Sequence, residues 1–189
     1  GVFKKIAYGD RTEGIVLVVD QPQQTLQNIL LPDDPLVCVV EAVEKPGNLG
    51  AIIRTADAAG LDAVLVADGG TDLYNPNVIR ASLGAIFHTP VCAASADDVL
   101  SWLTAEKFKI YAARVGGKRL YSEVDLSGRA AFALGSEAEG LTAIWSGPQI
   151  TPIGLPMRGV VDSLNVSVTA AILSYEARRQ RDGQSLARE

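Results

Sequence analysis

The most informative segment of this chain reads Ile153-Gly-Leu-Pro-Met-Arg-Gly-Val-Val-Asp-Ser-Leu-Asn-Val-Ser167. A strand-like apolar entry leads into a loop with Gly154, Pro156 and Gly159, and a helix is expected to open at Ser163. Such a loop exposes backbone amides and carbonyls, and the first turn of a helix presents free N–H groups. We therefore expect this junction to hold a small ligand at an edge lined by backbone.

Two further segments join a strand-like run to a turn in the same way. They read Glu44-Lys-Pro-Gly-Asn-Leu-Gly-Ala-Ile-Ile-Arg-Thr-Ala56 and Leu134-Gly-Ser-Glu-Ala-Glu-Gly-Leu141. Gly135 and Gly140 have the outer spacing of a phosphate loop, but Leu141 stands where that loop has its lysine. The pattern G-x-G-x-x-G is absent as well. The second segment therefore argues against a nucleoside triphosphate or dinucleotide site.

Composition indicates a globular chain of 189 residues with enough apolar content for a full core. No apolar run approaches the roughly 18 residues of a membrane span, and the start carries no signal-peptide pattern. We therefore expect a cytoplasmic protein without membrane contact. Cys38 and Cys92 lie in apolar runs and are expected as buried, reduced thiols. The single histidine, His88, leaves little for a zinc site or a triad, so no metal is expected.

The formal net charge of −5 argues against a wide electrostatic surface for nucleic acid. A local basic pocket is still compatible with this charge. Its candidate members are the cationic side chains near the three segments, Lys45, Arg54, Arg80, Arg114 and Arg158.

Short apolar runs alternate with helical patterns from Leu36 onward. Strands are expected at Leu36–Glu41, Ala63–Ala67, Lys109–Ala113, Ala130–Leu134 and Gln149–Ile153. Helices are expected at Leu49–Ala59, Pro76–Ser82, Ala96–Glu106, Ala138–Ile144 and Ser163–Arg181. Strands that are apolar on both faces and alternate with helices predict an α/β fold, a parallel sheet covered by helices on both faces.

The first 35 residues differ from the rest. Arg11–Val19 predicts a strand, Gln21–Leu31 is a candidate short helix, and the run Leu31-Pro-Asp-Asp-Pro35 is typical of a linker.

The three segments, in this order, resemble the motifs of the SpoU/TrmH family of RNA ribose 2′-O-methyltransferases, members of the trefoil-knot (SPOUT) superfamily. The resemblance runs from about Leu36 to Arg178. It implies a methyltransferase domain over residues 36–189 with a C-terminal trefoil knot, S-adenosylmethionine as methyl donor, an RNA substrate and a homodimer. It also implies that Gly1–Pro35 is the end of an N-terminal RNA-binding domain resembling ribosomal protein L30e, whose remainder is absent from this chain.

The resemblance assigns roles to single residues. The catalytic set would be Asn48, Arg54, Glu137, Ser163 and Asn165. The donor pocket would be lined by Leu134, Gly135, Gly140, Ile153, Leu155, Met157, Ser163 and Leu164. Arg54 would serve the ribose hydroxyl, either by removing its proton or by stabilising the alkoxide while it holds the adjacent phosphate. A guanidinium is an awkward base, but sequence does not separate the two roles.

The same residues taken alone permit simpler interpretations. Asn48 and Ser163 could be helix N-caps, and Arg54 a surface charge. Glu137 and Glu139 could stand in a first helical turn that the helix dipole favours.

Two other functions stay open. One is a knotted module that binds RNA or donor without catalysis, against which the complete catalytic set argues. The other is a related enzyme that methylates a base nitrogen, against which the segment from Asn48 to Arg54 argues. Ribosomal RNA is preferred over transfer RNA because of the L30e-like remnant.

Overall fold

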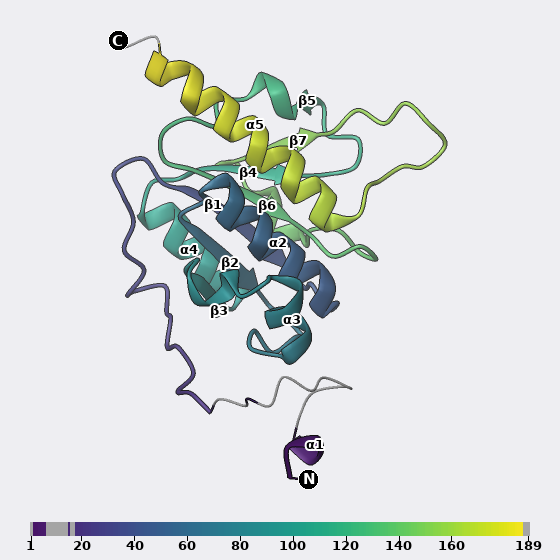
Figure 1. Cartoon of the computed structure of the whole chain (residues 1–189). Helices are drawn as coiled ribbons and strands as arrows, with labels where there is room; N and C mark the ends of the chain where they lie inside the picture. Colours follow the sequence, from purple (N-terminus) through teal and green to yellow (C-terminus); the bar gives the residue numbers. More distant parts are fainter. Residues whose placement is uncertain (1, 7–14, 16–17, 187–189) are drawn as a thin grey trace.

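The computed structural model describes residues 2–6, 15 and 18–186. Within these residues, seven strands form one sheet in the order β3-β2-β1-β6-β4-β7-β5 (Figure 1). The strands are β1 (Leu36–Glu41), β2 (Ala63–Ala67), β3 (Val91–Ala94), β4 (Lys109–Ala113), β5 (Arg119–Leu120), β6 (Ala130–Leu134) and β7 (Ile150–Gly154). Every neighbouring pair is parallel, which confirms the predicted sheet.

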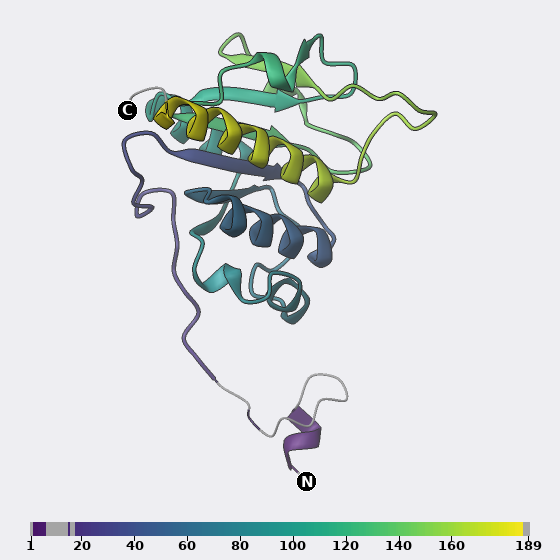
Figure 2. The same ribbon diagram turned by 45° about the horizontal axis from the view of Figure 1, so that its top comes forward.

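Helices cover both faces of this sheet. The described helices are α1 (Val2–Ile6), which lies apart from the sheet (Figure 1), and α2 (Pro46–Ala59), α3 (Pro76–Ala81), α4 (Ala96–Ala105) and α5 (Val166–Leu186). Short 3-10 turns stand at η1 (Ala85–Phe87), η2 (Tyr121–Glu123) and η3 (Ala143–Ser146). α2 and α5 lie side by side over one face (Figure 2), and α4 packs on the other. The predicted α/β class is therefore confirmed.

The central strand β1 shows why helices must pack on both faces of the sheet. All six of its residues are buried. Cys38 and Val40 join the apolar cluster under α2 and α5, whereas Val37 and Val39 join the cluster under α4. Successive strand residues point to opposite faces, so a strand with no polar face must be buried on both sides.

α2 and α5 run in the same direction, and side-chain hydrogen bonds join them at the start and at the end of α2. Near their N-terminal ends, the Asn165 side-chain amide donates to Asn48 Oδ1 at 3.3 Å. At the C-terminal end of α2, the Arg178 guanidinium from the later turns of α5 donates to Ala59 O at 2.7 Å and to Gly60 O at 2.8 Å. The apolar stripe of α5, formed by Val166, Ala170, Leu173 and Ala177, belongs to the core beneath.

The chain crosses itself closely where the loop after β4 meets the end of β7. A Cβ placed on Gly117 would lie 2.4 Å from the carbonyl carbon of Ile153, and one on Gly154 would lie 2.5 Å from Gly117 O. Only glycine leaves room for two backbones at this separation. The predicted trefoil knot itself stays a prediction.

Two helix predictions are wrong, and a third is wrong only about where the helix begins. Ala138–Ile144 is no helix, because the chain after β6 turns back on itself through the bridge Ser136↔Gly140 before η3 begins. The last helix begins at Val166 and not at Ser163. Gln21–Leu31 contains a turn but no helix.

Other elements differ in extent. α2 begins three residues earlier than predicted, because Pro46 opens the helix with its fixed φ, so Asn48 lies inside the first turn and is not the N-cap. The short strands β3 and β5 were not predicted, since four and two residues carry too little pattern. Most of the predicted strand Arg11–Val19 lies outside the described residues; Ile15, Val18 and Val19 are described, and they belong to no strand.

None of the helices in the described part of the chain is both long and apolar enough to cross a membrane.

The two cysteines supply a test of the packing. Cys38 and Cys92 are free and buried, as predicted, and burial raises the pKa of both thiols. Because the thiolate is the reactive form, we expect neither to react with a disulfide reagent in the native protein at neutral pH. Both should react in urea, and the absorbance of the thiol released from the reagent gives the number of reactive cysteines. Rapid labelling of either thiol in the native protein would contradict the burial described here.

Candidate active site

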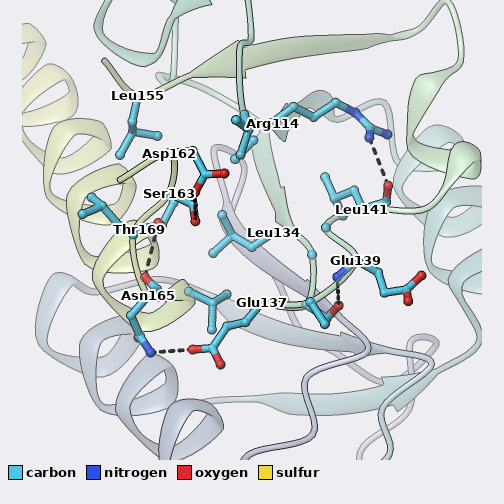
Figure 3. Close-up of a pocket in the computed structure, with 18 of the residues that line it drawn as sticks. Arg114, Leu134, Glu137, Glu139, Leu141, Leu155, Asp162, Ser163, Asn165 and Thr169 are labelled. Atoms are coloured by element: carbon cyan, nitrogen blue, oxygen red, sulfur yellow. Dashed lines mark hydrogen bonds between the residues drawn. The ribbon is translucent and has the colours of Figure 1, made fainter. Parts of the chain in front are cut away.

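A cavity of about 660 Å³ lies at the carboxyl edge of the sheet, beyond β4, β6 and β7. This volume is within the usual range for small-molecule sites. Its walls come from the chain after β4, the loop after β6, and the connection from β7 into α5 (Figure 3). The lining residues are Ala113–Val115, Leu134–Leu141, Leu155, Met157, Asp162–Val166 and Thr169.

The loop after β6 presents backbone to this cavity. Gly140 has a φ of +68°, and its N–H donates to Ser136 O at 3.0 Å. The Glu139 N–H donates to Ser136 Oγ at 3.1 Å. A Cβ on Gly135 would lie 2.0 Å from the carbonyl carbon of Gly140, so the loop can close only with glycine there. This closure replaces the helix that the sequence predicted.

Glu137 binds polar side chains from two other parts of the chain, the start of α2 and the residue before α5. Its Oε1 accepts hydrogen bonds from Asn165 Nδ2 at 2.6 Å and from Asn48 Nδ2 at 2.8 Å. Its Oε2 pairs with the ammonium of Lys45. The structure therefore brings together three members of the predicted catalytic set, Glu137, Asn48 and Asn165. We call these three residues with Lys45 the Glu137 cluster.

Asn165 connects the Glu137 cluster to α5. Its Oδ1 accepts from the Ser167 N–H at 2.9 Å and from Ser167 Oγ at 2.6 Å, which makes Asn165 the N-cap of the helix. Its amide nitrogen meanwhile donates to Glu137 and Asn48. Ser163 lines the cavity and donates to Asp162 Oδ1 at 3.1 Å, so the alternative that it caps the helix is wrong.

The hydrogen bond from Lys45, helped by that from Asn48, holds the pKa of Glu137 below its ordinary value. Glu137 is therefore ionised at neutral pH and accepts from every partner named above. A carboxylate with a lowered pKa is a weak general base. The geometry favours Glu137 as the residue that orients Asn48 and Asn165.

Arg54 projects from the exposed side of α2. It does not line the cavity, and no described residue accepts a hydrogen bond from it or pairs with its charge. The guanidinium faces solvent, where it is available to a second molecule.

The other predicted basic residues are dispersed. Arg80 and Arg158 are exposed and lie outside the cavity lining. Arg114 lines the cavity, but its guanidinium donates to Leu141 O at 3.0 Å, to Thr142 O at 2.9 Å and to Ser146 Oγ at 2.9 Å. Three of its five N–H donors are thus used inside the chain, so this geometry favours a structural role over the predicted contact with RNA.

Seven of the eight predicted donor-binding residues line the cavity. The exception is Ile153, whose side chain is fully buried in the core under α2 and α5. Sequence reasoning missed Thr169, although it stands one helical turn after Asn165 and its hydroxyl donates to Asn165 O at 3.3 Å. The spacing i, i+4 could have identified it.

The model of the SpoU rRNA Methylase family matches residues 35–175. This chain belongs to that family. One relative, the 23S rRNA (guanosine(2553)-2′-O)-methyltransferase RlmP of Bacillus subtilis, is 37% identical over 168 residues, which cover 86% of this chain and 68% of the relative. The 23S rRNA (uridine(2479)-2′-O)-methyltransferase of Streptomyces viridochromogenes is 31% identical over 92% of this chain and 63% of its own length.

Solved structures of similar SpoU proteins have the same fold. A crystal structure of an RNA 2′-O ribose methyltransferase is 48% identical with a TM-score of 0.77, over 84% of this chain and 61% of that one. The SpoU methyltransferase AviRb from Streptomyces viridochromogenes, in complex with AdoMet, is 29% identical with a TM-score of 0.81, over 87% of this chain and 67% of that one. The SpoU chain described here thus spans about three fifths to two thirds of the length of these relatives.

Replacing Lys45 by Met tests the electrostatics of the Glu137 cluster. The variant keeps a long side chain but loses the ammonium, so we expect the pKa of Glu137 to rise toward the ordinary value for glutamate. Carbonyl ¹³C NMR titration of Glu137 measures this value. As pH falls, the carboxylate should therefore become protonated earlier in Lys45→Met than in wild type. Lys107→Met, at an exposed lysine outside the cluster, is the control, and equal pKa values in all three proteins would contradict the described pairing.

Proposed function

We propose that this chain transfers the methyl group of S-adenosylmethionine to a ribose 2′-hydroxyl in ribosomal RNA. One observation carries the proposal: the backbone-lined cavity opens beside the Glu137 cluster, where donor and ribose could meet. The relatives named above are RNA 2′-O-methyltransferases, and a similar SpoU structure holds AdoMet. Family membership thus confirms the predicted enzyme class and methyl donor; the individual residue roles below are proposals.

The cavity fits the chemistry of the donor. Leu134, Leu155 and Met157 supply apolar surface for an adenine ring, and the loop after β6 supplies amides and carbonyls. The donor's sulfonium activates the methyl group without a metal. The residues of the cavity then need only hold the reacting groups in line, and such positioning can account for much of the rate.

In this reaction the bond from the methyl carbon to the ribose oxygen forms while the carbon–sulfur bond breaks, which releases S-adenosylhomocysteine, and the hydroxyl proton passes to water. We assign Arg54 to this hydroxyl and to the adjacent phosphate, because a solvent-facing guanidinium can bind a phosphate and stabilise a developing alkoxide. Asn48 and Asn165, held by Glu137, would orient the ribose, and Ser163, which lines the cavity, would contact the donor or the ribose.

A homodimer forms part of the proposal. Large apolar side chains are exposed near the cavity, on α5 and on the loop before it: Val160, Val161, Leu164, Val168 and Tyr175. This loop projects from the body of the molecule (Figure 1). An exposed apolar surface of this kind is typical of an interface, and a second copy that covered it would also enclose the cavity.

We further propose that Gly1–Pro35 belongs to an RNA-binding part related to ribosomal protein L30e. The chain has a net charge of −5, so its basic residues alone provide few phosphate contacts.

Binding of S-adenosylhomocysteine tests the donor site. We expect calorimetry to detect binding to the wild-type chain, and Leu155→Glu to weaken it by about tenfold or more, because a carboxylate would replace apolar wall. Leu30→Glu adds the same charge at a residue that is 91% exposed and outside the cavity, so it should bind as wild type does. Equal binding by all three proteins would place the donor elsewhere.

Replacing Arg54 tests the assignment to the RNA side. Arg54→Ala should lower methyl transfer by about 100-fold or more and leave the affinity for S-adenosylhomocysteine within a few-fold. Arg54→Lys should recover little, because an ammonium lacks the planar fork of donors. Labelled donor and total RNA, followed by mapping of 2′-O-methyl sites, would measure the activity and identify the RNA class. Arg119→Ala, at another exposed arginine, is the control, and near-normal turnover by Arg54→Ala would exclude the assigned role.

A further inference from the structure

Glu41, the last residue of β1, is a buried carboxylate that the proposed chemistry does not use. It is 1% exposed. Its Oε2 accepts from the Thr142 N–H at 2.7 Å, and its Oε1 accepts from Thr142 Oγ1 at 2.7 Å and from Trp145 Nε1 at 2.9 Å. No described cation forms a salt bridge with it. A buried carboxylate without a cation is costly, and here three donors compensate for the lost water.

All three donors belong to one short segment. Thr142 and Trp145 directly follow the loop that lines the cavity, whose last lining residue is Leu141. The Glu41 carboxylate therefore fixes the position of the chain where it leaves that loop.

Arg114 holds the same segment from the other side. Its guanidinium donates to Leu141 O, Thr142 O and Ser146 Oγ. The peptide groups around Thr142 thus give an N–H to an anion and a carbonyl to a cation. Arg114 follows β4, and Glu41 ends β1. Because β1 and β4 are the two neighbours of β6 in the sheet, the loop that leaves β6 is bonded to both flanking strands.

We propose that Glu41 is a positioning residue of the donor site. It holds Thr142 and Trp145, opposite Arg114, so that the backbone of residues 135–141 keeps the shape that receives S-adenosylmethionine. This inference rests on the proposed function of the cavity. Glu41 itself touches neither donor nor RNA, since it is buried behind the loop and does not line the cavity.

Glu41→Gln is the decisive variant. A carboxamide has nearly the same shape, but its NH₂ group would face one of the donors that the carboxylate accepts. We expect the KM for S-adenosylmethionine and the Kd for S-adenosylhomocysteine to rise by about tenfold or more, with kcat at saturating donor near that of wild type. Amide hydrogen exchange in residues 135–141 should become faster.

Val64→Ala is the matched control for a general loss of stability. Val64 is fully buried in β2 and outside the cavity lining, so its truncation lowers the melting temperature without changing the loop. Its donor KM and the exchange of residues 135–141 should stay as in wild type. If the control raised the donor KM as much as Glu41→Gln does, Glu41 would serve stability alone.

Thr142→Val removes one hydroxyl donor at constant shape and tests the contact if Glu41→Gln does not fold. It should raise the donor KM by less than Glu41→Gln does, and the two effects should not add in the double variant, because both remove the same contact. If a folded Glu41→Gln variant binds the donor as wild type does, the positioning role is excluded while the proposed function stands. If Glu41→Gln does not fold, wild-type donor binding by Thr142→Val excludes the role in the same way. If the wild-type chain neither bound S-adenosylhomocysteine nor methylated RNA, the proposed function itself would fail, and this inference with it.

Discussion

The parallel direction of all the paired strands is the constraint on which the rest of the structure depends. Parallel strands bring all their carboxyl ends to one edge, and the chain after β4, β6 and β7 therefore meets there. The same constraint requires long crossovers, which supply α2 and α4 as covers for the two faces. The cavity is thus a consequence of the topology, and its residues come from segments far apart in the sequence.

α5 adds what the sheet alone cannot provide. Its first turn is joined to α2 through Asn165 and Asn48, and its later turns are joined to the end of α2 through Arg178. Because Asn165 is both the helix cap and a partner of Glu137, the start of the helix and the carboxylate are placed by the same side chain. A change in the packing of α5 would consequently alter the hydrogen bonds of the Glu137 cluster.

The sequence predicted the elements that depend on local residue patterns. Continuous apolar runs identified five strands, because burial on both faces leaves a pattern. The helix expected at Ala138–Ile144 failed because the contact of Gly135 with Gly140 closes a loop that no local propensity describes. Glu41 was invisible for a different reason. It ends an apolar run, and its partners, Thr142 and Trp145, follow about a hundred residues later in the chain. Asn165, by contrast, came from the family resemblance, and the structure adds why an amide is needed there.

The two sides of the proposed site differ in how they are built. On the donor side, Glu41 and Arg114 bind the loop from both flanking strands, and glycines set its path, so its shape exists before any ligand arrives. On the RNA side, Arg54 is exposed, and Arg158 lies on a projecting loop. A small donor recognised mainly through backbone requires a rigid cavity, because a shift of one ångström would lose several contacts together. An RNA recognised through phosphates requires cations that can reach it, so exposure of Arg54 is what its proposed role demands and burial would have argued against it.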